Sequence, residues 1–115
     1  MEITIYHNPR CSKSRETLAL LRARGIEPTV VEYLQTPPSP AQLRSLLSAL
    51  GISARALVRD QETAWLDSGL QGSDDEARII DALHAHPILI ERPIVVRGTR
   101  AVLGRPPSNI ELLFD

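Results

Sequence analysis

The sequence is poor in the residues that build several common kinds of site, and each scarcity excludes a class of protein. Cysteine occurs once in 115 residues, which excludes an internal disulfide, and with three histidines the chain offers no cysteine-rich zinc site. The formal net charge is −1, and acidic and basic residues are interspersed, so no basic face for nucleic acid is expected. No apolar run is long enough to span a bilayer. We therefore expect no metal, nucleic acid or membrane contact, and a cysteine that acts as a thiol.

The length and the first residues of the chain favour a single intracellular domain. A domain of 115 residues buries roughly two-thirds of its unfolded surface, which is enough for a self-sufficient core. Residues 1–5 lead straight into an alternating strand, without the basic and apolar regions of a signal peptide. We predict one domain over residues 1–115, located in the cytoplasm and monomeric by default.

The first third of the sequence predicts a β-α-β unit that carries the cysteine in its first loop. Residues 3–6 alternate as a strand does, and residues 7–12 form a polar turn that contains a proline. Leucine and alanine at helical spacing predict a helix over residues 12–24, ended by Gly25. Residues 29–34 predict a second strand, so a right-handed parallel crossover is expected.

The middle of the chain, about residues 39–86, is predicted to be a helical insertion. It contains two capping boxes, in which a serine side chain and the side chain three positions later satisfy each other's backbone N–H groups. These boxes are Ser39 with Gln42 and Ser73 with Glu76. The helices expected here span residues 39–50, 53–58, 62–66 and 73–83.

The last quarter predicts an antiparallel hairpin and a helix. Residues 94–97 and 100–103 flank Gly98-Thr99, a two-residue turn suited to type II′. A third capping box, residues 108–111, predicts the start of a final helix. The order β-α-β, helices, β-β-α is that of a thioredoxin-like α/β fold: a mixed four-stranded sheet flanked by helices, with the insertion between its two halves.

Cys11 lies between a strand end and a helix start, where backbone N–H groups and the helix macrodipole favour a thiolate. Ser14 stands where a Cys-x-x-Cys motif has its second cysteine. Its hydroxyl can hydrogen-bond a thiolate but cannot resolve a mixed disulfide, so resolution requires an external thiol. The alternative is an inert loop cysteine, but the charged neighbours Arg10, Lys13 and Arg15 favour a reactive one.

Other polar residues are candidates to support the cysteine or to hold an anion. His7 either stabilises the thiolate as an imidazolium or is an ordinary polar residue at a strand end. A phosphatase-type loop is excluded because Thr17 occupies the position of its arginine, so an oxyanion site needs distant arginines. Arg59, Arg92 and Arg105 each lie beside a turn or a proline, and guanidinium forks suit tetrahedral oxyanions. Taken singly, each is as well explained as a surface charge.

Four segments of the chain together resemble the ArsC arsenate reductases. They are residues 7–15 (HNPRCSKSR), Pro37-Pro38, residues 86–96 (HPILIERPIVV) and residues 104–107 (GRPP), in order over essentially the whole chain. The resemblance implies that Cys11 attacks arsenate held by the three arginines named above. It implies further that glutathione, as co-substrate, forms a mixed arsenic adduct, and that glutaredoxin reduces this adduct so that arsenite leaves. No bound cofactor is implied.

The resemblance also implies a cis peptide bond before Pro93; the alternative is a trans proline at the start of a strand. One departure from the family pattern concerns the substrate. Typical members have Gly-Thr between the cysteine and the serine, whereas this chain has Ser12-Lys13. An additional cation there either helps anion binding or changes the substrate, because fold and family do not fix it.

Two other functions are compatible with a reactive cysteine on this fold. One is a glutathione-dependent reductase of mixed disulfides, in which the arginines bind glutathione carboxylates. The other is a Spx-like regulator that binds RNA polymerase and senses oxidants. The regulator is disfavoured because Arg105 is present and because a dithiol sensor would need cysteine in place of Ser14.

Histidine and tryptophan give weaker signals in the helical middle of the chain. His84 and His86 do not share a helix face and have no supporting cysteine or carboxylate cluster, so surface or capping roles are favoured over a metal site. Trp65, Leu66 and Leu70 are most simply core residues, with a partner surface as the alternative.

Overall fold

The computed structural model describes residues 2–114, which divide into two compact units. The first unit is made of the residues up to 36 and from 92 onward, and the second of residues 37–91. The second unit contains the predicted helical insertion and extends it to residue 91. Within the described part of the chain, no helix is long and apolar enough to cross a bilayer. A single domain over residues 1–115 stays a prediction.

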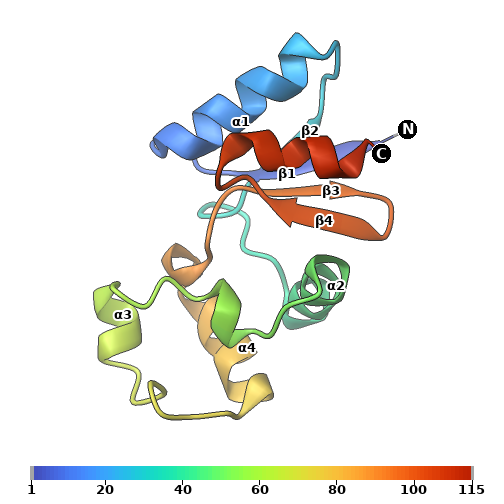
Figure 1. Cartoon of the computed structure of the whole chain (residues 1–115). Helices are drawn as coiled ribbons and strands as arrows, with labels where there is room; N and C mark the ends of the chain where they lie inside the picture. The colour runs from blue at the N-terminus through green and yellow to red at the C-terminus, as the bar shows by residue number, and fades with distance from the viewer. Residues whose placement is uncertain (1, 115) are drawn as a thin grey trace. The chain divides into compact units, whose positions relative to one another are not determined.

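A mixed four-stranded sheet with the order β2-β1-β3-β4 is the centre of the first unit (Figure 1). β1 (Ile3–His7) pairs in parallel with β2 (Thr29–Glu32), and α1 (Ser12–Ala23) connects the two strands. β1 also pairs antiparallel with β3 (Ile94–Arg97), which forms a hairpin with β4 (Arg100–Leu103). The predicted β-α-β unit and hairpin are therefore both confirmed, and with them the thioredoxin-like sheet.

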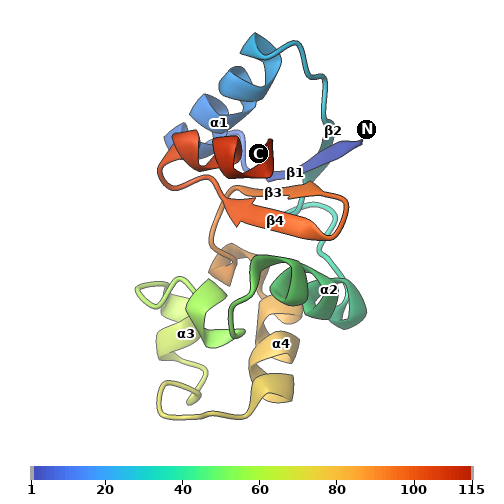
Figure 2. The same cartoon turned by 45° about the vertical axis from the view of Figure 1, so that its right-hand side comes forward.

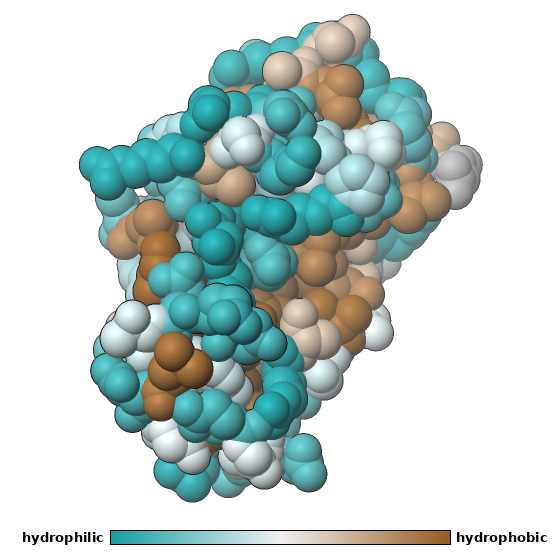
Figure 3. Space-filling model, turned by 60° about the vertical axis from the view of Figure 1, so that its left-hand side comes forward, coloured by the Kyte–Doolittle hydropathy of each residue, from teal (hydrophilic) through white to brown (hydrophobic). Residues whose placement is uncertain are grey.

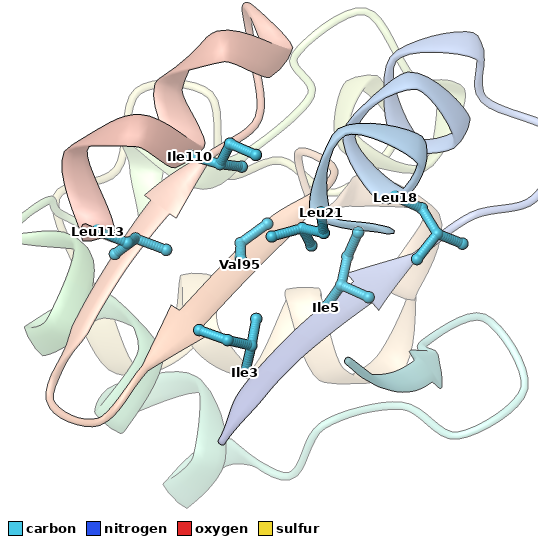
Figure 4. Packing of buried hydrophobic residues seen from close by; sticks show 7 residues of the cluster. All are labelled: Ile3, Ile5, Leu18, Leu21, Val95, Ile110 and Leu113. Atoms are coloured by element: carbon cyan, nitrogen blue, oxygen red, sulfur yellow. The ribbon is translucent and has the colours of Figure 1, made fainter. Parts of the chain in front are cut away.

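One face of this sheet is covered by α1 and by the C-terminal 3-10 helix η3 (Pro107–Leu113), which lie side by side in Figures 1 and 2. Alternate residues of β1 are buried, as expected for a strand that turns one face to a core. Full burial of each large aliphatic side chain contributes about 1.5–3 kcal/mol. This core therefore holds α1, and Cys11 at its N-terminal end, against the sheet. Its buried side chains, shown in Figure 4, are Ile3, Ile5, Leu18, Leu21, Val95, Ile110 and Leu113.

The second unit is helical. Its helices are α2 (Pro40–Leu50), α3 (Thr63–Leu66) and α4 (Glu76–Ala85), and its 3-10 turns are η1 (Arg55–Leu57) and η2 (Pro87–Leu89). α2 packs against α4. The segment predicted as a helix over residues 53–58 is thus a single 3-10 turn.

The capping box predicted at the start of α2 is confirmed. Ser39 Oγ accepts a hydrogen bond from the Gln42 N–H at 3.1 Å, and Gln42 Oε1 accepts one from the Ser39 N–H at 2.8 Å. The helix ends, as predicted, at Gly51, whose φ of 70° is the left-handed conformation that glycine adopts without a Cβ clash.

The capping box predicted for residues 73–76 is wrong. Asp75 is the N-cap of α4 and accepts a hydrogen bond from the Arg78 N–H at 3.2 Å. Glu76 accepts instead from the backbone N–H of Ala54 at 2.5 Å. The Glu76 carboxylate, which the local pattern predicted to cap the start of its own helix, is therefore bonded to a backbone N–H that is distant in sequence.

The capping box predicted for residues 108–111 is also wrong, and the final element is a 3-10 helix. Pro106 precedes η3 without a side-chain cap. Asn109 Nδ2 donates to the carbonyl oxygens of Leu103, at 3.0 Å, and Arg105, at 3.1 Å. These bonds tie η3 to the end of β4, and so to the segment that carries Arg105.

Trp65 and Leu70 are buried, which confirms their prediction as core residues, whereas Leu66 is 56% exposed and the same prediction is wrong for it. Adjacent helical residues point about 100° apart, so burial of Trp65 turns Leu66 outward. His84 Nδ1 donates to the Pro38 carbonyl at 2.9 Å, a structural role inside the second unit.

Exposed hydrophobic side chains are scattered along the chain. Hydrophilic side chains predominate on the face shown in Figure 3, with hydrophobic groups interspersed among them. Single exposed hydrophobic side chains are ordinary for a folded protein. The large hydrophobic residues at least 36% exposed are Leu20, Val30, Leu34, Leu66, Ile88 and Leu112.

Candidate active site

Cys11 lies at the N-terminal end of α1, where a short loop leaves β1. Its N–H donates to the Asn8 carbonyl at 3.0 Å, and Asn8 Oδ1 accepts from the Arg10 N–H at 3.0 Å, so the loop is closed on itself. Cys11 is the N-cap of the helix, with φ −95° and ψ 123°, and its carbonyl accepts from the Arg15 N–H. An N-cap faces the free N–H groups of the first helical turn, which favour an anion. The thiol is largely buried, with 8% of the residue exposed.

The guanidinium of Arg105 contacts the thiol. Arg105 Nη2 lies 3.8 Å from Cys11 Sγ, and Arg105 Nε donates to the Arg92 carbonyl at 2.8 Å. The second bond fixes the direction in which the planar guanidinium points. Because Arg92 precedes β3 and Arg105 follows β4, the hairpin brings the two arginines together, and Arg105 reaches the start of α1. A guanidinium is positively charged at every physiological pH, so this site favours an anion beside the sulfur.

Two cis peptide bonds accompany these arginines, Arg92–Pro93 and Arg105–Pro106. The first is the isomer that the family resemblance implied, and the second was not anticipated. The Gly104 N–H donates to the Pro93 carbonyl at 2.9 Å, which joins the residue before Arg105 to the residue after Arg92. Nε and Nη1 of Arg92 are shielded from solvent.

Ser14 supports the cysteine loop. Ser14 Oγ is hydrogen-bonded to His7 Nδ1 at 2.5 Å and accepts from the Asn8 N–H at 3.0 Å. Within the described part of the chain its hydrogen bonds go to these two partners and not to Cys11 Sγ. The expected bond from Ser14 to a thiolate is therefore not formed, because His7 and the Asn8 backbone occupy the hydroxyl.

Burial lowers the pKa of His7 below its ordinary value of 6.5. Glu32 opposes this effect and raises the pKa, while Arg22 and Arg15 lower it further. The neutral imidazole is thus the favoured form at neutral pH. The interpretation of His7 as an imidazolium is disfavoured, and the residue is better described as a buried polar support of the loop.

Replacement of Ser14 by alanine is expected to lower the free energy of unfolding by about 1–3 kcal/mol, because it leaves two buried polar groups, on His7 and Asn8, without their shared partner. Urea unfolding at neutral pH measures the change. Ser12→Ala is the matched control, since Ser12 is exposed on the same helical turn. Equal unfolding midpoints for the two variants would contradict this description.

The stability of the protein is expected to fall as the pH drops below 6.5, in part through His7. The unfolded chain takes up a proton at the ordinary pKa, whereas folded His7 resists it until the pH reaches its lowered pKa, so protonation favours the unfolded state between those values. Urea unfolding across this range, for the parent and for His7→Asn, measures the effect. The parent should lose more stability than the variant; parallel pH profiles would contradict it.

Arg59 belongs to the second unit. Its Nε lies 3.4 Å from the Glu62 carboxylate and its Nη1 lies 3.8 Å from that of Glu91. Two carboxylates of its own unit thus offset its charge. Arg105 is the arginine that contacts the cysteine sulfur, and its guanidinium is bonded to the Arg92 carbonyl. The parts of the Arg59 and Arg92 side chains in an anion site stay predictions.

Two residues of this region, Thr17 and Gly104, were not singled out from the sequence for support of the site. Thr17 is fully buried, and Gly104 packs against it. The helical spacing of Ser14, Thr17 and Leu21 places all three on the buried face of α1, and this periodicity could have identified Thr17. Gly104 belongs to the GRPP segment of the family resemblance, but the sequence does not show why glycine is needed there, because Thr17 comes from a distant helix.

Comparison with known proteins identifies relatives that share this framework. The model of the ArsC family matches residues 6–113. The chain is 50% identical over 111 residues to the uncharacterized protein YfgD of Escherichia coli strain K12, covering 95% of this chain and 93% of that protein. It is 46% identical over 115 residues to an arsenate reductase of Neisseria meningitidis (strain Z2491), covering 98% of each.

The solved structures agree. An arsenate reductase from Vibrio cholerae superposes with a TM-score of 0.93 at 46% identity, over 96% of each chain. The fold is thus that of proteins with close sequence similarity.

Proposed function

This chain belongs to the ArsC family, and from that premise we propose that it reduces arsenate to arsenite with Cys11 as the nucleophile and with glutathione and glutaredoxin as the sources of electrons. The observation that carries the proposal is the position of Arg105 Nη2, 3.8 Å from Cys11 Sγ. A guanidinium at that distance can hold an arsenate oxygen while the sulfur approaches arsenic.

The first step forms a bond between sulfur and arsenic. The Cys11 thiolate attacks arsenate, one arsenate oxygen is protonated and leaves as water, and arsenic remains in the +5 state. The guanidinium groups of Arg92 and Arg105 stabilise the negative charge on the remaining oxygens, as do the N–H groups at the start of α1.

The second step requires thiols from outside the chain, because Ser14 cannot act as a resolving thiol. The glutathione thiol replaces a second arsenic oxygen, which leaves as water, so that arsenic is bound to both sulfurs. A glutaredoxin thiolate then attacks the glutathione sulfur, and the electron pair of the arsenic–glutathione bond stays on arsenic. The products are a glutathione–glutaredoxin mixed disulfide and arsenic in the +3 state on Cys11. Water cleaves the arsenic–Cys11 bond, which releases arsenite and restores the thiol.

Lys13, the departure from the usual family pattern, does not argue against arsenate. Its Nζ lies 3.7 Å from the Glu16 carboxylate on the exposed side of α1. An exposed pair of this kind is weak, but it offsets the charge locally. We include Arg59 in the proposal as a further arsenate-binding residue. We also propose that the protein is a monomer and that it acts in the cytoplasm, together with glutathione and glutaredoxin.

The proposal is tested by arsenate-dependent oxidation of NADPH in a mixture of the protein, glutathione, glutaredoxin and glutathione reductase. We expect turnover that requires arsenate and each of the two thiol components. The same mixture with a glutathione mixed disulfide in place of arsenate tests the second reductase function. Turnover with the disulfide and none with arsenate would reject arsenate as the substrate.

A further inference from the structure

A contact between α1 and the end of β4 lies behind the cysteine and Arg105. Thr17 is fully buried on α1, and its Oγ1 donates to the Lys13 carbonyl one turn earlier at 2.7 Å. The same Oγ1 lies 3.4 Å from the Gly104 carbonyl, which is long for an O–H···O hydrogen bond. The contact between Thr17 and Gly104 is therefore mainly van der Waals packing.

Gly104 has no room for a side chain. A Cβ added there would lie 2.5 Å from Thr17 Oγ1, 2.7 Å from Pro93 Cγ and 3.0 Å from Thr17 Cγ2. Real Cβ atoms essentially never approach other atoms below 3.0 Å, so alanine at this position must push the segment away from α1. The glycine is required here by close approach and not by its backbone angle.

These contacts close a ring that ends on the thiol. Gly104 donates its N–H to the Pro93 carbonyl, and the next residue, Arg105, donates its Nε to the Arg92 carbonyl. Arg105 Nη2 then reaches Cys11, which begins the helix that carries Thr17. Displacement at one side of the ring therefore changes the separation between the guanidinium and the sulfur.

We infer that Thr17 and Gly104 are positioning residues, which set the distance between the Arg105 guanidinium and the Cys11 sulfur by the close packing of α1 on the end of β4. Both residues act through the position of Arg105, and neither is proposed to bind arsenate. That this distance matters for arsenate reduction rests on the proposed function. The effect of Thr17 and Gly104 on the distance does not, so it can be measured without arsenate.

The measurement compares alkylation of Cys11 by iodoacetate and by iodoacetamide. In both reactions a sulfur–carbon bond forms, the carbon–iodine bond breaks and iodide leaves, but only iodoacetate carries a negative charge. The ratio of the two rates therefore reports a positive charge near the sulfur and cancels the intrinsic reactivity of the thiol. Arg105→Ala sets the ratio in the absence of that charge.

Gly104→Ala is expected to lower the ratio by about three- to fivefold, the effect of losing a partly exposed charge contact. In the Arg105→Ala background the same substitution should lower it no further, because the effect acts through Arg105. Gly72→Ala is the matched control: its added Cβ meets nothing within 4 Å, and its ratio should equal that of the parent.

Variants of Thr17 separate shape from hydrogen bonding and guard against a folding defect. Thr17→Val keeps both branches of the side chain and should preserve the ratio, although it loses the bond to the Lys13 carbonyl. The double variant Thr17→Ala, Gly104→Ala should recover part of the ratio, because two of the three close contacts are removed while that with Pro93 remains.

Three results would overturn the inference. The first is a folded Gly104→Ala variant with the parental ratio of alkylation rates. The others are a Gly104→Ala effect in the Arg105→Ala background as large as in the parent, and a double variant whose ratio is no higher than that of Gly104→Ala. Absence of arsenate turnover in the parent would reject the proposed function alone, since the alkylation ratios would still follow the pattern above. If turnover is present, Gly104→Ala should raise KM for arsenate more than it lowers kcat.

Discussion

Replacement of Cys11 by serine is expected to abolish arsenate-dependent turnover, with a loss of at least about a thousandfold, because removal of a nucleophile eliminates the whole sequence of steps that depends on it. A serine hydroxyl is neutral at physiological pH and forms no bond to arsenic that a second thiol can reduce. The chain has no other cysteine to replace it. The NADPH-coupled assay measures the loss.

The substitution exchanges a single atom at the N-cap of α1, and serine is itself a favourable N-cap, so the fold should be kept. Ser12→Ala, a change at the next and exposed position, is the matched control and should retain turnover. Turnover in Cys11→Ser at the parental rate would show that the reaction does not pass through this residue.

Replacement of Arg105 by alanine is expected to reduce kcat/KM for arsenate by about 10- to 100-fold, mainly through KM, because a charge-assisted hydrogen bond to the oxyanion is worth about 1.5–3 kcal/mol. Arg105 Nη2 lies beside the sulfur to which arsenate must bind, and Arg105 Nε is held by the Arg92 carbonyl. Steady-state kinetics at varied arsenate concentration measures both parameters.

Arg105→Lys is the informative companion variant. Lysine keeps the positive charge but cannot make the two directed contacts of the guanidinium, so it should recover only part of the lost KM. Arg78→Ala, which removes an exposed arginine from α4, controls for the change in net charge and should match the parent. Parental kinetics in Arg105→Ala would exclude the guanidinium from arsenate binding.

The sequence was sufficient where a residue's role depends on its immediate neighbours. Cys11 was placed correctly between β1 and α1 because strand alternation, a proline turn and helical spacing follow one another along the chain. The Ser39 capping box was likewise correct, since both partners are three residues apart. Arg59, Arg92 and Arg105 were candidates because each lies beside a turn or a proline, and the family resemblance implied their common role. The hairpin brings Arg92 and Arg105 together.

The sequence was not sufficient to predict the hydrogen bonds of polar groups that have possible partners in more than one element. Glu76 was expected to cap its own helix but bonds the backbone of Ala54. Ser14 was expected to bond the cysteine sulfur, yet His7 and the Asn8 N–H take its hydroxyl. Which partner is bonded depends on which groups lie close together in the folded protein, and a local sequence pattern does not show this. The hydrogen bond that forms replaces the one that was expected, at a similar free energy.

The central claim, that external thiols reduce arsenic bound to Cys11, is tested most directly by chromatographic separation of arsenate and arsenite after one turnover. The protein, in excess over arsenate, would be mixed with glutathione alone, with reduced glutaredoxin alone, or with both. We predict arsenite in stoichiometric amount when both are present, and none from Cys11→Ser under the same condition. Arsenite formed equally by that variant, or none formed by the parent with both thiols, would contradict the account.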